Sequence, residues 1–90
     1  MAREKLQEAS DLLRSAAEST DDEQLQQRLH GQSSQLADLA TADRGPDHGR
    51  LARHMNALAE IADDADEATE GQVREARDAV SAFRETVEGV

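Results

Sequence analysis

Apolar residues recur along the chain at alternating steps of three and four, which is the spacing of one face of an α-helix. In the first half, this pattern predicts one helix from about residue 2 to 18 and a second from about 21 to 41. Ser19 and Thr20 lie between them and offer hydroxyl groups to cap the second helix. The two apolar stripes consist of Leu6, Ala9, Leu12, Leu13 and Ala16, and of Leu25, Leu29, Leu36 and either Leu39 or Ala40.

The second half repeats this organisation after a loop at about residues 42–47, which contains the single proline, Pro46. We expect a third helix from about 47 or 48 to 66 and a fourth from about 70 to 88. Thr69 resembles an N-cap, and Gln72 completes a capping box with it. The stripes are Leu51, Met55, Leu58, Ile61, Ala62 and Ala65, and then Val73, Ala76, Val80, Phe83, Val87 and Val90.

Short connections between the predicted helices favour antiparallel neighbours, so the sequence predicts an all-α, up-down four-helix bundle. We expect one domain, 1–90, with a hairpin at about 2–41, a loop at about 42–47 and a hairpin at about 48–88. A pair of long hairpins completed by a second subunit is the alternative. Ninety residues hold only a modest core, and self-association would supply further burial.

The two halves align at a shift of 49 residues, which places Leu6 on Met55 and Thr20 on Thr69. This match indicates a duplicated hairpin, although amphipathic periodicity alone also produces such pairs. Within the second stripe, Gly31, Gln32 and Ser33 form a small polar interruption. It either softens the helix or lets another backbone approach closely.

The charge balance indicates the kind of solvent in which this protein is stable. Twenty acidic residues oppose ten basic ones, of which only Lys5 is lysine, and the formal net charge is −10. Such a chain repels itself unless dissolved ions screen its charges, so we expect stability to depend on salt and monovalent cations to gather diffusely. The composition resembles that of halophilic archaea. The chain is similar to the short, acidic, wholly helical proteins of unknown function that haloarchaea encode, a resemblance that implies no site residues.

Several classes of function are excluded by what the sequence lacks. It has no cysteine, so it has no disulfide or thiolate metal site. No apolar run approaches the roughly 18 residues of a membrane span, and the charged N-terminus carries no apolar leader, which predicts a cytoplasmic protein without membrane contact. A chain with one aromatic residue, Phe83, and no sustained basic surface is not expected to bind nucleic acid.

Metal and enzymatic sites are not expected either. The Glu-x-x-His pairs of di-metal bundles are absent. A run of acidic residues could bind a hard cation such as calcium or magnesium, but it lacks the spacing of a calcium loop and is typical of a solvated helix face. The run consists of Glu60, Asp63, Asp64, Asp66, Glu67 and Glu70. No nucleophile elbow, phosphate loop or glycine fingerprint is present, so we predict neither catalysis nor a cofactor.

The stretch 29–36 resembles the motif of histidine phosphotransfer domains, in which a His precedes a Lys-Gly-Ser-Ser-like run. If His30 takes the place of the lysine, the acceptor position holds Gln27. If His30 is the acceptor, Ser33 stands where lysine belongs. His54 lacks the acid and proline that follow the histidine of sensor kinases. A phosphorelay function is therefore the least favoured alternative.

Basic residues concentrate in the loop and the first turns of the third helix, where backbone N–H groups and the helix dipole favour an anion. Asp43 and Asp47 lie in the same stretch, and the arginines could instead pair with acids of neighbouring helices. The predicted anion site consists of Arg44, His48, Arg50, Arg53 and His54.

The leading functional hypothesis is a non-catalytic, salt-adapted helical module that binds a protein partner or itself, most simply as a homodimer. Apolar residues left over from the core would form the interface; they are Leu29, Leu36, Met55, Val80, Phe83 and Val87. The alternative is a regulatory domain that responds to an anion or small ligand through the basic cluster.

Overall fold

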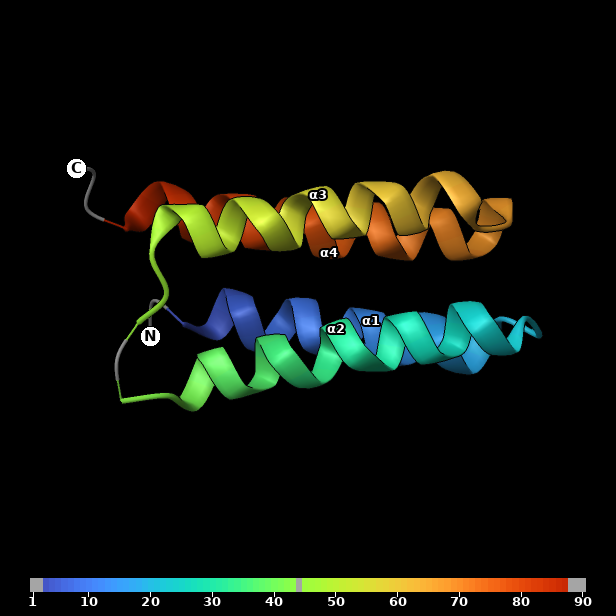
Figure 1. Ribbon diagram of the computed structural model, residues 1–90, viewed down its shortest axis with the longest axis horizontal. Coiled ribbons are helices and arrows are strands. Elements are labelled where there is room, and N and C mark those ends of the chain that lie inside the picture. The colour runs from blue at the N-terminus through green and yellow to red at the C-terminus, as the bar shows by residue number, and fades with distance from the viewer. Residues whose placement is uncertain (1–2, 44, 88–90) are drawn as a thin grey trace.

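The computed structural model describes residues 3–43 and 45–87, and it confirms the all-α four-helix bundle. Two antiparallel hairpins lie side by side, one made of α1 and α2 and the other of α3 and α4 (Figure 1). No strand occurs among the described residues. The helices are α1 Glu4–Ser19, α2 Glu23–Thr41, α3 His48–Asp64 and α4 Glu67–Thr86.

The four helices are not packed equally closely. α1 packs along both α2 and α4, and α3 packs along α4, whereas α2 and α3 make few close backbone approaches. The bundle is therefore closed along three seams and looser along the α2/α3 seam. The shared core consists of the buried apolar residues Leu6, Ala9, Leu13, Ala16, Ala17, Leu25, Leu29, Leu36, Leu39, Leu51, Leu58, Ile61, Ala62, Val73, Ala76, Ala79, Val80 and Phe83.

The α1/α2 seam is closed by two buried serines. The Ser10 hydroxyl donates to the carbonyl oxygen of Ser33 at 2.8 Å, and the Ser33 hydroxyl donates to the carbonyl oxygen of Ser10, also at 2.8 Å. The two hydroxyl oxygens are 3.0 Å apart. Because α2 is continuous through the exposed Gly31, the polar interruption marks a close approach between helices and not a break in the helix.

Aspartates, not the predicted hydroxyl residues, begin the last three helices. Asp22 accepts hydrogen bonds from the N–H groups of Gln24 and Leu25, and Asp66 accepts one from Thr69. The predicted N-caps at Ser19–Thr20 and Thr69 were therefore wrong, because an aspartate was available closer to the start of α2 and three residues before Thr69. The Thr69 N–H bond is also the main reason that the pKa of Asp66 is lowered.

The linker between the hairpins spans the predicted residues 42–47, of which residue 44 is outside the described part. At its end, Asp47 caps α3 by accepting a hydrogen bond of 2.8 Å from the N–H of Arg50. At its start, the Arg3 guanidinium donates to the carbonyl of Ala42. A cationic side chain thus satisfies backbone carbonyls where α2 ends.

The buried face of α3 differs from the predicted stripe at one important position. Met55 is only partly buried, whereas its neighbour His54 is 6% exposed. The core side of α3 is therefore rotated toward His54, which brings an ionisable ring into the loose α2/α3 seam.

Among the described residues, no helix combines the length and apolar character that a membrane span requires.

Candidate functional site

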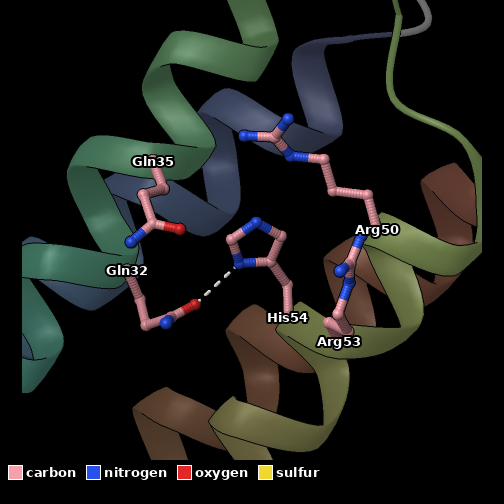
Figure 2. A pocket seen from close by; sticks show the side chains of 5 residues that line it. All are labelled: Gln32, Gln35, Arg50, Arg53 and His54. Atoms are coloured by element: carbon pink, nitrogen blue, oxygen red, sulfur yellow. Dashed lines mark hydrogen bonds between the residues drawn. The ribbon is translucent and has the colours of Figure 1, made fainter.

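A polar cavity of about 400 Å³ lies in the α2/α3 seam. Figure 2 shows side chains from the two helices converging on it, with two glutamines on one wall and the basic residues on the other. We call it the α2/α3 pocket, and it is lined by Gln32, Gln35, Arg50, Arg53 and His54. Its size lies within the range of about 300–1,000 Å³ that is usual for small-ligand sites.

His54 is held in one orientation by α2. Its Nδ1 lies 2.8 Å from Oε1 of Gln32, and because an amide oxygen only accepts, Nδ1 carries a hydrogen. In the neutral ring, Nε2 therefore keeps its lone pair. Figure 2 shows that this second nitrogen faces the side on which the Arg50 guanidinium lies. No hydrogen bond to Nε2 is formed within the described residues.

Burial and charge act on this ring in the same direction. Burial lowers the pKa of His54, and the positive charges of Arg50 and Arg53 lower it further. His54 is therefore neutral in the free protein near pH 7, and its Nε2 is a hydrogen-bond acceptor. A negative charge placed nearby would favour protonation of Nε2, which would then act as a donor.

Arg50 and Arg53 are exposed, and neither forms an ion pair within the described residues. Two other arginines of the bundle, Arg28 and Arg74, are ion-paired. Arg28 lies 2.9 Å from Asp64, and Arg74 contacts both Asp63 and Glu70 at 3.1 and 2.8 Å. The alternative, in which Arg50 and Arg53 pair with acids of neighbouring helices, is therefore not found among the described residues.

The pocket lining contains no carboxylate. Arg50 also borders a second cavity of about 380 Å³ beneath the linker, where Asp38 and Asp47 line the wall. Arg50 thus stands between an acidic cavity and the cationic α2/α3 pocket. Guanidinium groups with free hydrogen-bond donors recognise planar carboxylates and phosphates, so the pocket has the chemistry of an anion site.

Comparison with known proteins places the chain in a family. A model of a family of unknown function, DUF7553, matches residues 1–86. The chain belongs to the DUF7553 family. No curated protein and no solved structure matches it. The match agrees with the resemblance to proteins of unknown function, while the haloarchaeal part of that resemblance stays a prediction.

The structure brings together three of the five predicted anion-site residues of this DUF7553 protein, and Arg44 lies outside the described residues. His48 is turned away, with its Nε2 3.1 Å from the carbonyl oxygen of Val87 and its Nδ1 accepting a bond of 3.2 Å from Arg84. It ties the start of α3 to the end of α4 and does not line the pocket.

Gln32 and Gln35 were missed as site residues. They lie three positions apart and so share one face of α2, but this face becomes informative only when α3 is known to lie opposite. Sequence spacing within one helix does not reveal which neighbour it faces.

Four of the six predicted interface residues belong to the core of this DUF7553 protein. Leu29, Leu36 and Val80 are fully buried, and Phe83 is 4% exposed. Met55 and Val87 are partly buried against the core. The bundle buries its own apolar stripes. The four core residues Leu29, Leu36, Val80 and Phe83 therefore present no surface to a partner.

Four of the six residues of the acidic run make structural contacts. Asp66 caps α4, and Asp63, Asp64 and Glu70 bind arginines. Within residues 3–43 and 45–87, no group of three or more His, Cys, Asp or Glu side chains is placed to hold a metal ion. Ser33, which aligned with the lysine of the phosphotransfer motif, is instead buried against Ser10.

Proposed function

We propose that this protein is a non-catalytic module that binds a small anion in the α2/α3 pocket. The observation that supports it is the convergence of Arg50 and Arg53, neither of them ion-paired, on a cavity whose lining contains no carboxylate. In a chain with twenty acidic and ten basic residues, most charged side chains that an arginine could meet are acidic. Arg50 and Arg53 form no ion pair within the described residues and so retain their capacity to bind an external anion.

The net charge of −10 opposes the approach of an anion at low ionic strength. The Debye length falls from about 30 Å at 0.01 M salt to about 3 Å at 1 M, so concentrated salt hides the distant carboxylates but leaves direct contacts in the pocket. We therefore expect specific anion binding to be favoured in concentrated potassium chloride.

Isothermal titration calorimetry with sulfate in molar potassium chloride tests the proposal. Arg50→Gln and Arg53→Gln should each weaken binding about tenfold or more, since a hydrogen bond to a charged group contributes about 1.5–3 kcal/mol. Arg14→Gln is the matched control, because Arg14 is exposed on α1 and is not among the pocket residues. Equal losses in all three variants, or no binding by the parent protein, would refute the proposal.

We further propose that the bundle is adapted to concentrated salt, as the haloarchaeal resemblance implies, and that it works in the cytoplasm. The support is its charge excess, together with the exposure of nearly all the carboxylates among the described residues. Helical circular dichroism should fall when potassium chloride is removed. A variant with Glu18, Glu60, Glu75 and Asp78 changed to their amides should need less salt to fold. Identical spectra with and without salt would contradict this proposal.

A second candidate function keeps the predicted self-association but moves it to the α1/α4 face. There, Leu12 is partly buried and borders a groove of about 330 Å³ with Ala79 and Ala82. The groove is also lined by the charged residues Lys5, Glu8, Glu75 and Asp78. Leu12→Asp should reduce any dimer measured by light scattering at high salt, whereas Gln27→Asp, an exposed change of equal charge on α2, should not. A monomer at every salt concentration would exclude this candidate.

A further inference from the structure

The α2/α3 pocket offers more positive charge than one monoanion would neutralise. Arg50 and Arg53 are permanently cationic, and His54 can add a third charge. The amide groups of Gln32 and Gln35 are neutral, and the lining has no carboxylate. A ligand with two negative charges balances both guanidinium groups and still leaves a hydrogen-bond acceptor for a protonated imidazole.

The orientation of His54 suits such a contact. Gln32 already holds the Nδ1 hydrogen, so a proton taken from solvent must go to Nε2, the nitrogen on the Arg50 side of the ring (Figure 2). The imidazolium then donates from Nδ1 to Gln32 and from Nε2 to the ligand. No bond within the described residues has to be broken for this protonation.

Building on the anion-binding function proposed above, we propose that the pocket takes the dianionic phosphate group of a small phosphomonoester and that His54 gains a proton as the ligand binds. The cavity of about 400 Å³ has room for a phosphate with a small organic group.

The charges around His54 determine the direction of this coupling. From its own helix, Arg50 and Arg53 oppose protonation, and from α2 only the neutral glutamines face the ring. On the α4 side, Arg77 donates to the carbonyl of Met55, the residue after His54, so the charge that α4 brings there is also positive and opposes protonation. A bound dianion neutralises the arginines and favours the imidazolium. Binding should therefore raise the pKa of His54, and the affinity should increase as the pH falls.

Sulfate is the probe for the proton step, because it remains a dianion between pH 5 and 8 and cannot itself take up the proton. NMR of the histidine side-chain nitrogens at constant ionic strength follows each ring. With sulfate, the titration midpoint of His54 should move to higher pH, while the side-chain nitrogen signals of His30, which is exposed on α2, should not respond to sulfate. Sulfate affinity should rise as the pH is lowered from about 7.5 to 5.5, by at most about tenfold per pH unit for one proton.

The possible outcomes separate the two proposals. Sulfate binding that is independent of pH, with an unmoved His54 midpoint, would overturn the proton uptake but leave anion binding intact. No binding at any pH would overturn both. His54→Gln should bind sulfate without the pH dependence, and if it does not fold, the NMR experiment on the parent protein still decides.

Ligand class is tested by competition against sulfate with acetate, inorganic phosphate and phenyl phosphate. Phenyl phosphate should compete best, inorganic phosphate less well, and acetate at least tenfold more weakly than either, as expected for a site that matches two negative charges. Competition by acetate as strong as that by phenyl phosphate would overturn the assignment of a dianion. A clear preference for inorganic phosphate over the ester would point to the free ion as the ligand and overturn the phosphomonoester.

Discussion

Polar side chains are closely packed on the face of α2 that meets α1, but they line a cavity on the face that meets α3. Toward α1, Ser33 meets Ser10, and each hydroxyl bonds the backbone carbonyl of the other residue. Toward α3, the adjacent residue Gln32 meets His54 at the edge of a cavity. Adjacent positions of one helix thus face a closed seam and an open one.

Side-chain length explains much of this difference. Serine is short enough for two helix backbones to approach, and both hydroxyls are satisfied inside the protein. Glutamine and arginine are long, so they keep α2 and α3 apart, and the donors of Arg50 and Arg53 remain available to solvent or a ligand. The buried serines therefore stabilise the α1/α2 seam, whereas the longer polar side chains of the α2/α3 seam remain available to bind a ligand.

The largest effect should come from filling the closed seam. Ser33→Leu removes buried hydrogen bonds and inserts bulk where the backbones are close, so it should lower the free energy of unfolding by about 3 kcal/mol or more. Gln35→Leu in the open seam has free space beside it and should change stability by less than about 0.5 kcal/mol. Urea unfolding in molar potassium chloride compares them, and equal losses would show that the two seams do not differ.

A smaller effect is expected from removing one member of the serine pair. Ser10→Ala should cost about 1 kcal/mol, because the carbonyl of Ser33 loses its donor. The double change with Ser33→Ala should cost less than the sum of the single changes, since the hydroxyls bond reciprocally. Strict additivity in the same unfolding assay would argue against the coupled arrangement.

The open seam should respond to pH where the closed seam does not. Because the pKa of His54 is lowered in the fold, the unfolded chain binds its proton first, and stability should decline as the pH falls below about 6.5. Asp66 contributes separately at lower pH. Its folded pKa is also lowered, so its contribution is lost only as the pH falls through that value.

Unfolding measured from pH 8 to 5 without added sulfate isolates the His54 contribution. His54→Gln should remove the decline near neutral pH, and His30→Gln, the exposed control, should retain it. A decline that persists in His54→Gln would assign it to another group.

The smallest effect should come from the ion pair that crosses the α2/α3 seam at a different point. Arg28 and Asp64 lie 2.9 Å apart, but their side chains are 42% and 67% exposed. Arg28→Gln should therefore cost no more than about 0.5 kcal/mol. A loss above 1 kcal/mol in the unfolding assay would mean that ion pairing, and not the shared core, holds α2 against α3.

Periodicity was sufficient to predict the helices and most core positions, since every leucine of α1 and α2 except the partly buried Leu12 lies in the core. It did not predict the helix starts, because Asp66 and Thr69 both have good capping chemistry and only the backbone geometry selects between them. Nor did it predict that His54, and not Met55, is buried. One step around a helix separates these residues, and the packing of neighbouring helices decides which of them turns inward.

The site was predicted in part for the same reason. Arg50, Arg53 and His54 are close in sequence, so a local pattern revealed them. Gln32 lies 22 positions from His54 and joins it only through tertiary packing. His48 looked equivalent to His54, yet it points to α4 because six positions carry it to another side of the helix.

The three aspartates that begin α2, α3 and α4 have a consequence for altering the charge of this protein. Asp22, Asp47 and Asp66 hold backbone N–H groups at the points where the chain reverses direction or leaves the linker. Part of the acidity is therefore architectural and would be needed in any solvent. A version redesigned for dilute buffer should exchange carboxylates along the middle of the helices and retain these three.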